Sequence, residues 1–210
     1  MFCNVTEWLD YYPSQTTRIK DQEIRSTVRV VTPPTTEPVT IAEAKTQLNI
    51  GASDDSHDTE LAALIAAARE EWERDTSIAL ITRTLEHRLP KFLTVIQLSV
   101  RPVIAISFIK YTDALGVEQT VSSADYYLDG DEVRFLSTFT NPTLQDRSEA
   151  VRVTYPAGYG TSSSACPEMD RMAIRLSLAH RFEDRDMISA AGERKAYEAL
   201  VAKKMRASYP

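Results

Sequence analysis

The stretch TPPTTEPVTIAEAKTQLNI, residues 32–50, joins a proline-rich leader to the start of a helix. Each proline fixes its own φ and biases the residue before it away from helical geometry, so the leader is expected to be extended. Thr40 is followed three residues later by Glu43, which is the signature of a capping box. We therefore predict a stiff leader and then a helix over residues 40–50, ended by Gly51.

Two further helices are predicted from apolar side chains at helical spacing, over residues 58–76 and 167–184. Pro167 suits the first helical position, where a missing N–H costs nothing. The predicted stripe of the first of these helices is Leu61, Leu64, Ile65, Ala68 and Trp72, and that of the second is Met169, Met172, Ala173, Leu176 and Ala179 or His180. We expect the first stripe to form a core with Ile41, Leu48, Met172 and Leu176.

Residues 78–155 carry β-branched and aromatic runs separated by turn residues, which is typical of an antiparallel β region. DALGVEQ at 113–119 and LDGDEV at 128–133 are typical hairpin turns. TVRVV, residues 27–31, is a further candidate strand. The predicted fold class is α+β, mainly a helical bundle with a small antiparallel β region and extended N- and C-terminal segments.

Both ends of the chain are predicted to lie outside the main domain, residues 30–188. Residues 1–29 contain an aromatic cluster, Trp8, Tyr11 and Tyr12, but no long apolar period, so we interpret them as an arm that needs another surface to pack on. Residues 189–210 contain a final helical stretch whose apolar residues are on one side.

The composition of the 210-residue chain is that of an ordinary folded protein, with 43% hydrophobic and 26% charged residues. Its net charge of -6 argues against a basic nucleic-acid-binding surface. No apolar run approaches the ~20 residues that span a bilayer, and the N-terminus lacks the pattern of a secretory signal. Cys3 and Cys166 are far apart, which favours a reducing compartment over a disulfide framework.

The charge is unevenly distributed. Residues 37–76 hold ten acids and three bases, a net charge of -7, whereas residues 192–210 hold two acids and five bases, a net charge of +3. A basic tail on an acidic body indicates either contacts with copies and partners or simply a solvated tail.

Candidate catalytic and metal-binding residues are few. The cluster DDSHD, residues 54–58, lacks the spacing of a calcium loop, and we interpret it as an acidic leader that favours the positive end of the next helix. Cys166 could act as a nucleophile only with a histidine base, and His57, His87 and His180 form no known local signature with it. We expect no enzymatic activity, no cofactor and no bound metal.

Four blocks in series resemble the head–tail connector (adaptor) protein family of tailed bacteriophages. They are VVTPPTTEPVTIAEAKTQLNI (30–50), DTELAALIAAAREEWERDTSIALITRTLEHRL (58–89), VTYPAGYG (153–160) and CPEMDRMAIRLSLAHRFEDRD (166–186). Each block alone is weak, but their order and spacing together are specific. The resemblance covers residues 30–188, leaves out the N-terminal arm, and covers the last helix only loosely.

The resemblance implies a structural virion protein of the neck, present in the host cytoplasm during assembly. Such adaptors form a homo-oligomeric ring, typically a dodecamer, under the portal protein. They contact the next neck or tail protein and extend a channel through which double-stranded DNA passes without sequence-specific binding. The family has no membrane partner and no catalytic residue to carry over, and it acts in tail assembly and genome ejection.

In that family the C-terminal segment commonly docks into the portal, which here implies the residues Tyr197, Leu200, Val201, Lys203, Lys204, Met205 and Arg206. We expect the arm residues Trp8, Tyr11 and Tyr12 to contact a neighbouring subunit, and the stiff leader to act as a strap that reaches a neighbour. The alternatives are another neck or tail-completion component, such as a stopper, and a small cysteine-dependent enzyme.

Overall fold

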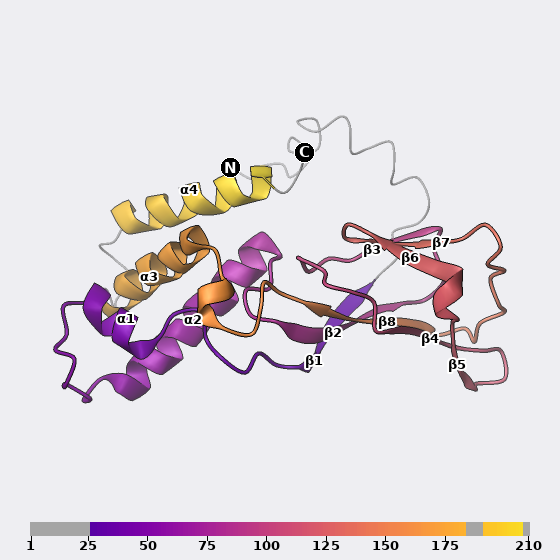
Figure 1. Ribbon diagram of the computed structural model, residues 1–210, viewed down its shortest axis with the longest axis horizontal. Helices are drawn as coiled ribbons and strands as arrows, with labels where there is room; N and C mark the ends of the chain where they lie inside the picture. Colours follow the sequence, from indigo (N-terminus) through magenta and orange to yellow (C-terminus); the bar gives the residue numbers. More distant parts are fainter. Residues whose placement is uncertain (1–25, 184–190, 208–210) are drawn as a thin grey trace, which may run out of the picture.

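The computed structural model describes residues 26–183 and 191–207, so the arm residues Trp8, Tyr11 and Tyr12 lie outside the described part. The molecule is elongated, with a helical half at one end and a β half at the other (Figure 1). Each half has its own hydrophobic core.

The helical half contains α1 (Ile41–Gln47), α2 (Asp58–Thr76), α3 (Glu168–Glu183) and α4 (Ala191–Ala207). The capping box is formed: Glu43 N donates to Thr40 Oγ1 at 3.2 Å, and Thr40 N donates to Glu43 Oε2 at 2.9 Å. The first helix ends at Gln47, earlier than predicted, and Gly51 does not end it. Asn49 takes the left-handed conformation (φ 56°) just beyond the last turn, a position that asparagine tolerates.

The core of the helical half is built around the predicted face of α2. Leu61, Ile65, Ala68 and Trp72 are buried, and Leu64 packs against them while partly exposed. Further residues of this core come from the segment before α1, from α1 and its end, from residues 78–81, from Cys166, from α3 and from α4; they include Val39, Ile41, Ala44, Leu48, Ile78, Leu80, Ile81, Ala173, Ile174, Leu178 and Tyr197.

The predicted buried face of α3 is correct at Ala173 and Ala179 but wrong at Met169, Met172 and Leu176. Met172 is 50% exposed, Met169 is 36% exposed and Leu176 is half-buried outside the core. The inward face includes the polar residues Asp170 and Ser177 beside Ala173, Ile174 and Leu178. Because Asp170 and Ser177 interrupt the inward face, hydrophobicity alone selected the outward methionines.

The β half contains two antiparallel sheets (Figure 1). The larger has the order β1-β2-β8-β4-β5 and the smaller the order β3-β7-β6. The strands are β1 (Thr27–Thr32), β2 (Arg83–Leu89), β3 (Val95–Gln97), β4 (Phe108–Thr112), β5 (Glu118–Thr120), β6 (Tyr126–Asp129), β7 (Glu132–Phe135) and β8 (Val151–Ala157). Both predicted hairpins are present, β4–β5 and β6–β7, with left-handed Gly116 (φ 82°) and Gly130 (φ 61°) in their turns.

The two sheets enclose the second core. Alternate residues of β2 and β8, such as Leu85, Leu89, Val151 and Val153, meet Val133 of the smaller sheet there. The described residues contain helices and strands in similar amounts, so the fold is α+β. The expectation of a mainly helical bundle is therefore wrong. Several strands of the β half are short and polar, so their periodic signal is weak, and the amount of β structure was underestimated from the sequence.

The proline-rich leader joins the two halves of its own chain. Thr36 Oγ1 donates to the carbonyl of Thr161 at 2.9 Å, Arg171 Nε donates to the carbonyl of Pro38 at 3.1 Å, and Val39 is buried. These contacts hold the leader against its own chain, and the expectation that it also reaches a neighbour stays a prediction.

Candidate interaction surfaces

Helix α4 packs on α2 and α3 through its apolar side (Figure 1). Tyr197 is 8% exposed, and its ring meets Trp72 edge to face. Its hydroxyl donates to Asp75 Oδ2 at 3.1 Å. Burial, together with the nearby carboxylates Glu71 and Asp75, raises the pKa of Tyr197, so its phenol stays a donor.

Lys204, near the C-terminal end of α4, makes a second set of contacts with the body of the chain. Its Nζ lies 2.8 Å from Oδ2 of Asp170, a residue that is fully buried, and 5.4 Å from the centre of the Tyr159 ring. Burial opposes the charge on Lys204, but the interactions with Asp170 and Tyr159 together raise the pKa of the amine, whereas burial also raises the pKa of the Asp170 carboxyl. The contact between Lys204 and Asp170 ties α4 to the first turn of α3.

The predicted docking residues thus fall into two groups in this conformation. Tyr197, Leu200, Val201 and Lys204 contact the chain's own body, whereas Lys203 and Met205 are exposed. The side chain of Arg206 lies outside the described residues. A docking role for the inward group stays a prediction that requires α4 to leave its place.

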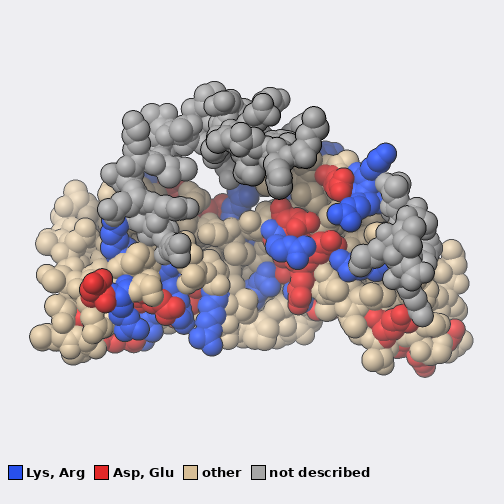
Figure 2. Space-filling view, turned by 180° about the vertical axis from the view of Figure 1, so that it is seen from behind, with Lys and Arg blue, Asp and Glu red and all other residues tan. Residues whose placement is uncertain are grey.

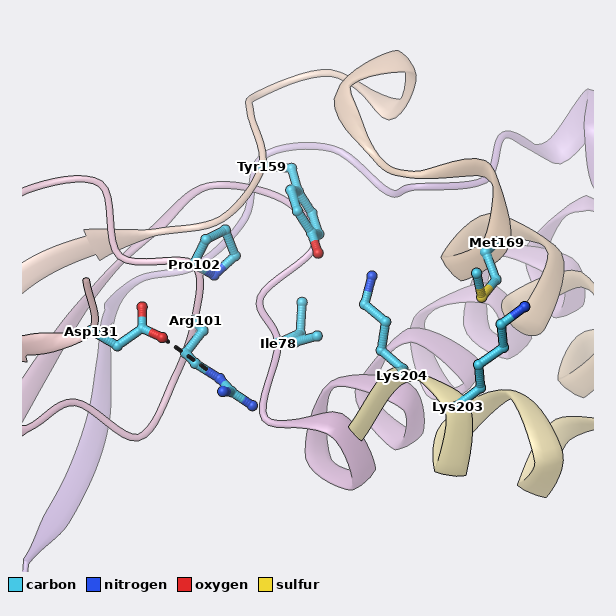
Figure 3. A pocket seen from close by; sticks show the side chains of 8 residues that line it. All are labelled: Ile78, Arg101, Pro102, Asp131, Tyr159, Met169, Lys203 and Lys204. Atoms are coloured by element: carbon cyan, nitrogen blue, oxygen red, sulfur yellow. Dashed lines mark ion pairs between the residues drawn. The ribbon is translucent and has the colours of Figure 1, made fainter. Parts of the chain in front are cut away.

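A pocket of about 390 Å³ lies where α4 meets the β half (Figure 3). Ile78, Pro102 and Met169 give it apolar walls, and Arg101, Asp131, Tyr159, Lys203 and Lys204 complete it. Arg101 Nε lies 3.9 Å from Asp131 Oδ2, and Lys204 is paired with Asp170. The pocket is therefore close to charge balance, with exposed Lys203 at its edge beside Met169.

A buried ion network connects the two halves, and the sequence analysis missed it. Glu73 Oε2 lies 2.9 Å from Arg69 and 2.8 Å from Arg83, while Glu73 Oε1 accepts the N–H of Leu80 at 3.0 Å. Arg69 also donates to Glu37 of the leader at 2.8 Å. The (i, i+4) spacing of Arg69 and Glu73 was a signal for part of it. No signal in the sequence identified the other partners.

The outward face of the larger sheet is polar and internally paired. Arg88, Arg152 and Lys110 are cross-strand neighbours on β2, β8 and β4. Arg88 pairs with Glu86 and Glu149, and Glu118 pairs with both Lys110 and Arg152. Figure 2 likewise shows acidic and basic side chains intermixed along the middle of one face. Such balanced charges do not form a basic track for nucleic acid.

Cys166 does not have the surroundings of a nucleophile. Its thiol is buried and donates to the carbonyl of Leu80 at 3.4 Å. Burial raises the pKa of the thiol to about 11, so the reactive thiolate is scarce at neutral pH. Among the residues the structure describes, no group of side chains is arranged to hold a metal ion.

The DDSHD cluster contacts both α1 and α2. Lys45 Nζ lies 3.0 Å from Asp55 and 2.7 Å from Asp58, and Asp58 stands in the first turn of α2. Within the described residues, no helix combines the length and apolar character needed to cross a bilayer.

Comparisons with known proteins give matches among solved structures. No protein-family model and no curated protein matches the chain. A protein in the neck of an empty gene transfer agent (GTA) particle, solved with C6 symmetry, is 25% identical, with a TM-score of 0.73 over 85% of this chain and 94% of the other.

Two further matches come from native GTA particles. One, from the virion, is 26% identical with a TM-score of 0.70, and covers 84% of this chain and 94% of the other. The second, from the neck solved with C12 symmetry, is 26% identical with a TM-score of 0.61, and covers 80% and 93%. The arrangement of helices and sheets described above is therefore shared with proteins of a phage-like particle.

Proposed function

We propose that this chain is a structural protein of a phage-like virion neck: a ring-forming adaptor that binds under the portal, extends the DNA channel and joins head to tail. The observation that carries the proposal is the similarity to GTA neck proteins over most of both chains, at 25–26% identity. Because those necks were solved with C6 and C12 symmetry, a ring of twelve copies is the expected assembly.

The surface chemistry supports a structural role along a DNA channel. DNA must slide through such a channel, and many unpaired Lys or Arg contacts to phosphates would retain it. Here the bases Arg88, Lys110 and Arg152 of the larger sheet are paired with acids, and the net charge of the chain is -6. The buried, weakly acidic thiol of Cys166 supports the same role over a cysteine-dependent enzyme.

The C-terminal segment is proposed to dock on the portal, with α4 changing its contacts. Lys203 and Met205 are available for a first encounter, because they are exposed in the packed conformation. The inward residues Tyr197 and Leu200 become available only when α4 separates from α2 and α3. The portal must then replace the contacts that α4 loses, so docking requires a large apolar surface on the portal.

The proposal is tested by mixing the purified chain with the portal protein of its own particle and separating the complexes by sedimentation. We expect the chain to travel with the portal and to show a ring in negative-stain images. A chain lacking residues 191–210 should no longer travel with the portal. A chain that binds only a preformed neck ring, and never the portal, would instead be a stopper or another neck component.

A further inference from the structure

Helix α3 presents an apolar stripe on its outward face. The stripe consists of Met169, Met172 and Leu176, at helical spacing along the same side. Met172 is 50% exposed and Met169 36%, and none of the three belongs to the core of the helical half. Met169 also forms an apolar wall of the pocket beside Lys203, so the stripe continues into a hollow (Figure 3).

The stripe is not the only group of exposed apolar side chains on the described surface, since Val28, Val30 and Val31 are exposed on the edge strand β1, but the stripe borders a pocket. Leu115 and Val117 are exposed in the β4–β5 hairpin turn and do not line this pocket, and a few exposed apolar residues are normal. A row of exposed side chains that runs into an apolar-walled pocket is instead typical of a surface that another segment covers. Methionine is flexible and polarizable, and it makes favourable contacts with aromatic rings.

The chain itself contains a segment with the matching chemistry. Trp8, Tyr11 and Tyr12 form an aromatic cluster in the N-terminal arm, without an apolar period of their own. Two acids, Glu7 and Asp10, flank the cluster. Lys203 stands beside Met169 at the edge of the pocket, so the charges around the stripe suit those around the aromatic residues.

The arm is also long enough to reach well beyond the strand that follows it. It precedes β1, which starts at Thr27 in the β half, whereas α3 lies in the helical half (Figure 1). The segment from Trp8 to Thr27, if extended, spans roughly 60 Å at about 3.3 Å per residue. In a closed ring each subunit would give its arm to one neighbour and receive the arm of the other, which satisfies every stripe.

We infer that the α3 stripe is the docking surface for the aromatic arm of a neighbouring copy. This inference rests on the proposed ring and adds to it the pair of surfaces that would join the subunits. The rings of Trp8, Tyr11 and Tyr12 pack on Met169, Met172 and Leu176, and Lys203 faces the acids of the arm.

Cysteine cross-linking between two differently tagged chains tests the inference. Both chains carry Cys3→Ser; one carries Met172→Cys and the other Tyr11→Cys. They are mixed with the portal, oxidised, and compared by non-reducing gel. We expect a heterodimer of the two tags. The matched control replaces Met172→Cys by Glu70→Cys, at a carboxylate on α2 that is 71% exposed, and should give at least about tenfold less heterodimer.

The outcomes separate this inference from the proposed ring, because the copy number of each mixture is measured by native mass spectrometry. Rings without the heterodimer overturn the inference and leave the ring intact. A disulfide found only within a chain that carries both Met172→Cys and Tyr11→Cys shows that the arm covers its own stripe, which also overturns it. If no ring forms even with unmodified chains and portal, both fail.

A second variant tests the stripe without cross-linking. Met169→Ser with Met172→Ser removes the exposed apolar groups while the core residues of α3 are unchanged. We expect the concentration needed for ring formation to rise by about tenfold or more, with an unchanged thermal melt of the single chain. Ring formation at the original concentration would overturn the inference.

Discussion

The indole ring of Trp72 and the phenol ring of Tyr197 meet edge to face, with centroids 5.7 Å apart and planes at 71°. Trp72 is on α2 and fully buried, whereas Tyr197 belongs to the C-terminal helix α4. The contact makes α4 part of the core of the helical half. The C-terminal segment is therefore a packed element whose release, if docking requires it, has a free-energy cost set by these contacts.

Tyr197→Ala should lower the free energy of unfolding by about 3–5 kcal/mol, because it empties a buried aromatic site. Tyr197→Phe keeps the ring and loses only the hydrogen bond to Asp75, so it should cost about 0.5–1.5 kcal/mol. Urea denaturation measures both. Glu198→Ala, at an exposed neighbour on α4, is the control and should cost under about 0.5 kcal/mol. Equal effects of Tyr197→Ala and Glu198→Ala would show that α4 is not docked.

Lys204→Met should cost about 3–5 kcal/mol, because it leaves the buried carboxylate of Asp170 without its partner. Adding Asp170→Asn to Lys204→Met should restore part of the loss, since the remaining buried group is then neutral. A double-mutant cycle by urea denaturation measures the coupling. Purely additive losses would mean that the two side chains do not interact in solution.

Gly158→Ala should lower the free energy of unfolding by at least about 2 kcal/mol. Gly158, directly after β8, has φ 137°, a backbone conformation that is strained for residues with a side chain. A Cβ there would also meet the backbone of Thr82 at 2.6 Å. Gly51→Ala is the matched control: nothing lies within 4 Å of its Cβ position, and the change should be neutral or slightly stabilising. Similar melting temperatures for the two variants would contradict the close approach of β8 to residues 81–82.

His87 should make stability fall in mild acid. It is buried in the β core with neither ring nitrogen hydrogen-bonded to the described chain, and burial lowers its pKa. A folded pKa below the unfolded value means that the unfolded state binds the proton more readily. The contribution of neutral His87 to the free energy of unfolding is then complete above about pH 6.5 and is lost as pH falls below it.

The variant His87→Leu places an apolar side chain in the β core and removes the titration. Its free energy of unfolding should change less between about pH 7 and pH 5 than that of the unmodified chain. The measurement is urea denaturation at both pH values. The same slope for both proteins would show that His87 is not a buried neutral group in solution.

The sequence predicted elements whose signals are local. The capping box of Thr40 and Glu43, the bounds of α2 and both glycine hairpins depend on neighbouring residues, and the structure confirms them. The hydrophobic stripe of α2 was also correct, because the residues that it names are apolar and pack in the core, whereas the burial of Arg69 and Glu73 on the same helix was not predicted.

The sequence could not predict features that depend on distant partners. Asp170 is buried because Lys204, on another helix, compensates its charge, and nothing near Asp170 in the sequence indicates this. Because the burial of Asp170 was not predicted, Met169 and Met172 were wrongly expected on the buried face of α3. The pairing of Glu73 with Arg83 likewise had no local signal in the sequence. The contact of the leader residue Thr36 with Thr161 was not predicted either, because the two residues are far apart in sequence. The partly inward orientation of the proposed docking residues was missed for this reason too.

Native mass spectrometry of the complex with the portal, which counts the copies of this chain, tests whether the chain forms a neck ring on the portal. We expect twelve copies per portal ring, in agreement with the C12 symmetry of the similar neck. A chain that remains a single copy in the presence of saturating portal would contradict this expectation.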